Sequence, residues 1–449
     1  MRSRYSAPFC AALALLLLAS LFSFVLSASR RITVADCERL GIPVLLVDTS
    51  SLGGIKRKDK YERATVRYTD SDSAWSAKIR GHGNSTWRTP LTQKRPYLLK
   101  FDEPTPLVEG LPAARKWILL ANAFDRSMLR NYYAEHLSHN VWNRMRWNPR
   151  SAFVTLFLDG KYMGLYGVTE KADIAPGRIE FSGDGFLAEV DSHEGRPYSF
   201  SGIDMLSFHI REPKTTDEDY ERYAEKILEL EHIIYDRDFN DEDGFSKHFD
   251  EASFIDWYLL EEFQKNFDAK FYNSVFMTYD YDTERLSMGP VWDSDLGFGN
   301  TSRSDFLIYS FYGELLSDDE WSEIFPALES QKRVDKVHSP EGFLINQQFW
   351  FNRLFADKRF VRSVRARYAQ TREALAESIK WIREQGELLN EAAGLNDSVW
   401  GFIGSSIYPR APGYLKRKTY MSEVEYLADW CERRMAWLDG VFLDGDSYD

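Results

Sequence analysis

The sequence EFQKNFDAKFYNSVFMTYDYDTERLSMGPVWDSDLGFG, residues 262–299, is the stretch that decides the predicted fold. Its pattern predicts the end of a helix, a loop, two short strands and a second loop. The first loop carries Asp268 and Asn273, and the second carries Asp293 and Asp295 directly after an apolar run. A hairpin joins the two loops, so their side chains can converge on one metal ion.

The order of these features is more specific than any one acid. A kinase fold needs one Asp to orient the acceptor hydroxyl, and an Asn and a later Asp to hold Mg²⁺ against the nucleotide phosphates. Asp268 and Asn273 match the D-x-x-x-x-N part of a kinase catalytic loop. Asp293 follows a predicted strand, as the metal-binding Asp does, and Asp295 begins a variant of Asp-Phe-Gly. We therefore predict Asp293 as the principal ligand and Asp295 as a second one.

The size and charge of the chain restrict the classes of protein that fit. A chain of 449 residues suits two domains or lobes, because domains usually contain about 100–200 residues. The formal net charge is −13, so a nucleic-acid partner held on a large basic face is not expected. A metal ion or a cationic protein substrate fits this charge better.

The N-terminal segment has the pattern of an export signal. Arg2 and Arg4 precede an apolar run, and small residues lie near residue 28. We expect residues 1–28 to be a cleaved signal peptide or, if uncleaved, a membrane anchor. The mature chain would keep Cys37 and Cys431, which either pair or remain free thiols.

The rest of the chain divides into a strand-rich and a helix-rich half. Strands are expected at residues 42–47, 65–68, 73–79, 95–101, 116–121 (or a helix start), 152–158, 162–169 and 186–190. Helices are expected at residues 126–142 after Asp125, from Thr216 with Asp219, at 253–266 with Ser253 and Asp256 at the start, and near 342–357, 363–388 and 422–438. Glu262 is interpreted as a solvated helix residue. The predicted domains are residues 29–190 and 191–449.

Other catalytic signatures are missing from the sequence. It contains no H-E-x-x-H or C-x-x-C metal motif, no G-x-S-x-G elbow and no P-loop. His82 and His136 are assigned no function.

Five separated motifs resemble a known family. They are residues 79–87 (IRGHGNSTW), 94–101 (KRPYLLKF), 117–131 (WILLANAFDRSMLRN), 162–170 (YMGLYGVTE) and 291–299 (VWDSDLGFG). In this order they are similar to the CotH family, the spore coat protein H type of atypical secreted kinase, over about residues 35–300. The resemblance implies an α+β, bilobal, kinase-like fold that uses ATP with Mg²⁺ or Mn²⁺. It further implies phosphorylation of Ser or Thr on secreted or surface proteins, in a secreted, periplasmic or cell-surface location. The sequence lacks the Gly-x-Gly-x-x-Gly loop and the His-Arg-Asp triplet of ordinary kinases.

The resemblance also implies roles for individual residues. Asp268 would be the general base or orienter, with Asn273 and Asp293 as metal ligands. The cofactor side is less specific, and the candidates are Arg80, Lys94, Lys100 and Glu170. Glu135 is considered as an ion-pair partner of the phosphate-binding Lys, although helical Glu residues are usually solvated, and Arg130 is expected to form a structural ion pair.

Two other functions remain open at this point. A catalytically silent surface, coat or adhesin protein could use the same fold to bind a partner. A metal-dependent glycosyltransferase or hydrolase could use Asp293 and Asp295 as an Asp-x-Asp site.

Overall fold

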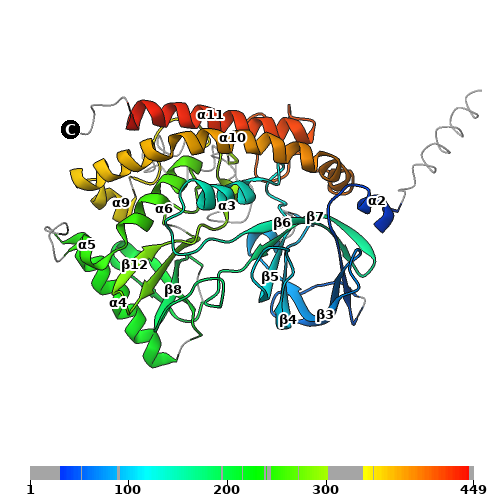
Figure 1. Ribbon diagram of the computed structural model, residues 1–449, viewed down its shortest axis with the longest axis horizontal. Helices are drawn as coiled ribbons and strands as arrows, with labels where there is room; N and C mark the ends of the chain where they lie inside the picture. Colours follow the sequence, from blue (N-terminus) through cyan, green and yellow to red (C-terminus); the bar gives the residue numbers. More distant parts are fainter. Residues whose placement is uncertain are drawn as a thin grey trace, which may run out of the picture.

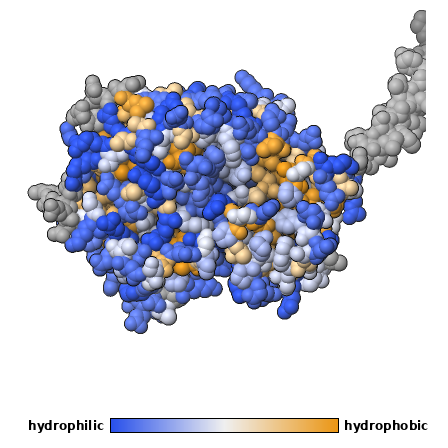
Figure 2. Space-filling model, in the orientation of Figure 1, coloured by the Kyte–Doolittle hydropathy of each residue, from blue (hydrophilic) through white to orange (hydrophobic). Residues whose placement is uncertain are grey.

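The computed structural model describes residues 31–443 with the exception of residues 52, 88–91, 194–195, 215, 237–238, 240–243, 272, 302–336 and 347. The predicted signal segment, residues 1–28, lies outside the described residues. Among the helices that the structure describes, none is both long enough and apolar enough to cross a bilayer. Hydrophilic side chains cover most of the face shown in Figure 2.

The N-terminal strands close into a barrel. The strands are β1 (Val44–Thr49), β2 (Glu62–Tyr68), β3 (Ala74–Gly81), β4 (Tyr97–Thr105), β5 (Ala114–Leu120), β6 (Ser151–Leu158) and β7 (Lys161–Glu170). Their order is β1-β2-β3-β4-β5-β7-β6, and parallel pairing of β1 with β6 completes the ring. All seven lie where the apolar patterns predicted a strand, and alternate side chains such as Ile79, Leu99 and Trp117 fill the interior. The closure itself follows from no local pattern.

A second sheet supports the stretch at residues 262–299. Its order is β12-β11-β8-β10-β9. The strands are β8 (Gly185–Val190), β9 (Ser199–Ser201), β10 (Ser207–Glu212), β11 (Val275–Asp280) and β12 (Arg285–Met288). The chain therefore changes sheets between β7 and β8, earlier than the predicted boundary at residue 190. The apolar run before Asp293 was expected to be a strand over residues 288–292, but β12 ends at Met288 and residues 289–292 are not a strand.

Helices cover the second sheet and extend along the barrel (Figure 1). They are α2 (Val34–Glu38), α3 (Arg130–Asn140), α4 (Asp217–Tyr235), α5 (Phe245–His248), α6 (Glu251–Gln264), α9 (Phe349–Leu354), α10 (Lys358–Trp400) and α11 (Tyr420–Phe442). At 43 residues, α10 is much longer than predicted, and it contacts both α6 and β7. A mixed α+β chain with a strand-rich N-terminal and a helical C-terminal region is thus confirmed.

Two predicted helix starts are wrong. The helix expected from residue 126 begins at Arg130, because Asp125 accepts hydrogen bonds from the amides of Ser127 and Arg130 across an intervening loop. Arg130 also pairs with Asp125 at 2.5 Å, which confirms its structural role. The start of α6 is capped by Asp250, whose carboxylate accepts from the amide of Ser253.

The interpretation of Glu262 as a solvated residue is wrong as well. Its carboxylate is fully buried and accepts hydrogen bonds from the amides of Leu344 and Ile345, both at 2.7 Å. Arg434 on α11 donates to it at 2.8 Å. Glu262 therefore fastens the C-terminal helices to α6, a role that requires partners far away in the sequence. Cys37 and Cys431 are both buried free thiols.

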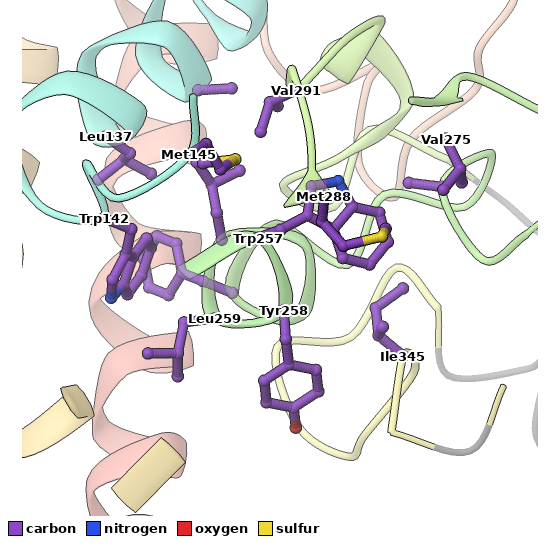
Figure 3. Close-up of a cluster of buried hydrophobic side chains, with 14 of the residues drawn as sticks. Leu137, Trp142, Met145, Trp257, Tyr258, Leu259, Val275, Met288, Val291 and Ile345 are labelled. Carbon is purple, nitrogen blue, oxygen red and sulfur yellow. The ribbon is translucent and has the colours of Figure 1, made fainter. Parts of the chain in front are cut away.

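A large apolar core lies directly behind the two predicted loops. Figure 3 shows side chains from α3 and α6 meeting those of β11 and β12, among them Leu137, Trp257, Val275 and Met288. Because closely packed interiors resist deformation, this core gives the loops a rigid base.

Candidate active site

A cleft of about 900 Å³ lies between the barrel and the second sheet. Arg80 from β3 and Ile118 from β5 line one wall, and Glu189 from β8 and Arg211 from β10 line the other. The cleft is also lined by five of the eight predicted site residues, which are Arg80, Asp268, Asn273, Asp293 and Asp295. The two loops predicted to converge therefore do so.

Asn266 connects the two loops. The helix α6 ends at Gln264, and Lys265 then adopts the left-handed conformation with φ 48°, which turns the chain toward the cleft. The side chain of Asn266 accepts from the amide of Asp268 at 3.2 Å and donates to the carbonyl of Asp293 at 3.2 Å. In the sequence, Asn266 and Phe267 stand before Asp268 in place of the His-Arg of the kinase triplet, and no role was predicted for Asn266. Its place two residues before Asp268, where the His-Arg-Asp triplet has its His, was the available signal.

The helix α3 holds the loop of Asp293 from the other side. Asp293 has φ 57° and precedes a short 3₁₀ turn, Ser294–Leu296. The amide of Ser294 donates to the side-chain oxygen of Asn131 at 2.7 Å. Asn131 also lines the cleft, and sequence reasoning missed it because its partner lies more than 160 residues away.

The carboxylates of the cleft repel one another. Burial and the neighbouring charge of Asp293 raise the pKa of Asp268 to about 7. Burial raises the pKa of Asp293, and burial with the charges of Asp293 and Asp268 raises that of Asp295 well above its usual range. A cation bound among these acids would stabilise their ionised form, because its positive charge offsets their mutual repulsion.

The donor set suits a cation that arrives with phosphates. Within the described ranges, no three His, Cys, Asp or Glu side chains form a metal site by themselves. Mg²⁺ is commonly held by one or two carboxylates together with substrate phosphates and water. Asn273 supplies a further oxygen, which at present accepts hydrogen bonds from the amide and hydroxyl of Ser192 at 2.9 and 2.8 Å. The residues present therefore fit Mg²⁺ or Mn²⁺ with a nucleotide.

Cations face these acids across the cleft. Arg80 donates to the carbonyls of Lys58 and Gly81, which fixes its guanidinium at the cleft wall. Lys171 also lines the cleft, whereas Arg211 on the opposite wall pairs with Glu189 at 3.0 Å. His82 lies among these groups, and burial together with the charges of Arg80 and Lys171 lowers its pKa to about 3. No function was predicted for His82 from the sequence, but the structure places this residue in the lining of the cleft.

Three predicted cofactor residues do not line the cleft. Lys94 is fully buried inside the barrel, where its ammonium donates to the carbonyls of Ala121 and Leu165 at 2.7 and 2.6 Å, and burial lowers its pKa. Lys100 is exposed on the outer face of β4. Glu170 is buried and accepts from the amide of Arg150 at 3.1 Å.

Glu135 makes no ion pair with either of these lysines. Its carboxylate accepts a hydrogen bond from Ser151 at 2.7 Å, and burial raises its pKa to about 8. The possible pairing with the phosphate-binding Lys is therefore wrong.

A second group of charges, missed in the sequence, completes the C-terminal wall. Asp191 follows β8 and lies 2.6 Å from both His193 and Arg196. Burial acts to raise the pKa of Asp191, but the hydrogen bonds of His193 and the charge of Arg196 outweigh it. The Asp-Ser-His sequence after a predicted strand was a usable signal.

Carboxylates and an amide that face cations across one cleft define a site suited to metal-dependent phosphoryl transfer. The family model described as CotH kinase protein matches residues 79–438. The chain therefore belongs to the CotH kinase family, and the similarity extends beyond the predicted limit near residue 300 into the C-terminal helices. No curated protein matches the sequence significantly.

Proposed function

We propose that this protein is an extracytoplasmic kinase that transfers the γ-phosphoryl group of ATP to Ser or Thr of secreted or surface proteins. The supporting observation is the meeting of the Asp268 and Asp293 loops at one cleft, opposite Arg80. In this proposal the barrel and the helical part are the two lobes of a kinase-like fold. Attachment to a membrane would require that residues 1–28 remain uncleaved.

Each group in the cleft has a distinct role in the proposed reaction. Asp268 orients the acceptor hydroxyl and takes its proton as the new oxygen–phosphorus bond forms and the bond to the bridging oxygen of ADP breaks. Asn273, Asp293 and Asp295 would hold the cation, which supplies charge neutralisation for the phosphates. Arg80 and Lys171 would contact phosphate oxygens.

The direct test is phosphate incorporation from labelled ATP with Mn²⁺ or Mg²⁺. We expect Asp268→Asn and Asp293→Ala to lower the rate on the order of 10²-fold or more. Asp282→Asn is the control, since Asp282 is exposed at the tip of the same hairpin. Incorporation that persists in both cleft variants would refute the assignment. A wild-type protein with neither incorporation nor a nucleotide-induced thermal shift would instead favour a catalytically silent binding protein.

A further inference from the structure

Four cations form a straight row across the outer face of the barrel. In the strand register Arg63 of β2 lies opposite Lys78 of β3, Lys78 opposite Lys100 of β4, and Lys100 opposite Lys116 of β5. We call these four residues the basic row. Like charges directly opposite one another on neighbouring strands destabilise a sheet. Such a row in a chain of net charge −13 therefore needs a reason.

Acidic side chains satisfy only one end of the basic row. Lys116 lies 3.0 Å from Asp173 and 3.7 Å from Glu212. Arg63, Lys78 and Lys100 are exposed, and no ion pair reaches them from any residue that the structure describes. Three adjacent cations are thus available to a negatively charged partner.

The basic row borders the cleft. Side chains two residues apart on a strand share a face, so Arg80 lies about 7 Å from Lys78 along β3, and Arg80 lines the cleft. Figure 1 shows β5, which carries Lys116, on the side of the barrel toward β8. A molecule bound along the row would therefore reach the entrance of the cleft.

A basic loop extends the same surface. Residues 55–61 read IKRKDKY, and Lys56 and Lys60 are exposed. The carbonyl of Arg57 accepts from the amide of Gly81 at 2.9 Å, which holds this loop beside the end of β3. Lys58, in the same loop, lines the cleft. Cations thus continue from the row to the cleft wall.

We propose that the basic row and the adjoining loop dock an acidic segment of the protein substrate, next to the Ser or Thr that enters the cleft. This inference rests on the proposed kinase function and names its substrate class. The three cations left without an ion pair by the described residues lie on three neighbouring strands that span about 10 Å, or roughly three residues of extended peptide, and Lys56 and Lys60 of the loop lengthen this surface. The acceptor would therefore lie beside a run of about four acidic residues.

Direct binding tests the docking without any catalysis. The probes are two labelled peptides that contain one Ser, one with four adjacent Glu and one with four Gln, and the readout is fluorescence anisotropy. We expect the Glu peptide to bind at least about tenfold more tightly, and added salt to weaken its binding. The variant Arg63→Glu/Lys78→Glu should lose this preference. Lys161→Glu, an exposed residue of β7 in the same barrel, should keep it.

Two results of the binding experiment would overturn the docking proposal. The first is equal affinity for the two peptides or an unchanged preference in the double variant. The second is binding of the wild-type protein to anionic lipid vesicles with none to the Glu peptide, which would assign the surface to a membrane.

A kinase assay separates the two proposals. If both hold, Arg63→Glu/Lys78→Glu raises KM for the Glu peptide about tenfold, while the nucleotide-induced thermal shift stays at the wild-type value. Phosphorylation of both peptides with the same KM would refute the docking and leave the kinase function intact. Absence of phosphorylation with preserved anisotropy differences would refute the kinase function and leave the acidic docking surface standing.

Discussion

Glu262 and Arg434 form a buried ion pair that joins the middle of the chain to its last helix. Arg434 also donates to the carbonyls of Pro340 and Gly342, so its removal would leave several buried acceptors without a donor. Breaking a buried pair by removing one partner costs about 3–5 kcal/mol, because an uncompensated charge remains.

We predict that Arg434→Met lowers the free energy of unfolding by about 3–5 kcal/mol. Denaturant titration measures this change, and Arg433→Met, an exposed neighbour, is the control. The double variant Glu262→Gln/Arg434→Met should recover part of the loss. Equal unfolding midpoints for Arg434→Met and Arg433→Met would contradict the prediction.

Glu261 makes stability depend on pH. Burial raises its pKa from 4.5 to about 8, against a hydrogen bond from Gln264. The folded state therefore holds the proton more tightly than the unfolded state, and the contribution of this group to stability falls as pH rises from about 4.5 to about 8. Each unit of raised pKa corresponds to about 1.4 kcal/mol.

Glu261→Gln should remove this part of the pH dependence. We expect the variant to lose less free energy of unfolding than the wild type between pH 5 and pH 8.5, as measured by denaturant titration at both values. Glu384→Gln changes an exposed Glu of α10 and should follow the wild-type curve. The prediction would be contradicted if the free energy of unfolding changed equally with pH in Glu261→Gln and the wild type. The carboxylate of Glu261 would then ionise in the folded state without destabilising it.

The helix α3 acts on the site through Asn131, whose side chain holds the amide that follows Asp293. Loss of one such hydrogen bond costs about 1–3 kcal/mol locally. Misplacement of a catalytic group by about 1 Å can lower a rate on the order of 10²-fold.

We predict that Asn131→Ala lowers kcat by about 10–100-fold and weakens the dependence on Mn²⁺ or Mg²⁺ while the fold persists. Steady-state kinetics at several metal concentrations, together with the thermal midpoint, would measure this. Asn140→Ala lies on the same helix, where the described part of the chain gives its side chain only His136 as a partner, and should retain activity. If Asn131→Ala lowered the thermal midpoint without changing the metal dependence of kcat, Asn131 would contribute to stability alone and the prediction would be wrong.

Individual elements differ in how well local sequence predicts them. The barrel strands follow apolar alternation, and Thr216 caps α4 as expected. The strands β9 and β10 were missed because they lie among Gly and Pro residues. Pairing of β10 with β8, and of β9 with β10, overrides the weak local preference there. The extra length of α10 comes from contacts with both parts of the molecule.

Across the whole molecule, Arg126 ties one wall of the cleft to the C-terminal region. Its guanidinium donates to the carbonyls of Phe402, Ser405, Ile407 and Pro409. Tyr408, which lies in this segment, lines the cleft, and its ring centroid is 4.9 Å from that of Phe124.

We predict that Arg126→Met opens the segment at residues 402–418. The lost hydrogen bonds cost about 1–3 kcal/mol each, which raises the open population roughly tenfold or more. Limited trypsin digestion under native conditions should cut this segment correspondingly faster. The control is Arg115→Met, at an exposed site on β5, which trypsin should cut at the wild-type rate. A wild-type rate for Arg126→Met as well would show that these hydrogen bonds do not hold the segment closed.

The sequence by itself determined the barrel strands, most of the helices, the family and the candidate loop residues Asp268, Asn273, Asp293 and Asp295, because strand alternation, helix caps and motif spacing are local properties. The tertiary structure decided the closure of the barrel, the burial of Glu262 and the position of Lys94 inside the barrel instead of at the cleft. Those outcomes depend on partners more than 25 residues away, and no local pattern records which distant carbonyl, amide or charge will compensate a buried group. The candidate acids of residues 262–299 could therefore be recognised in the sequence. Their convergence on one cleft depends on α3, the second sheet and Asn266.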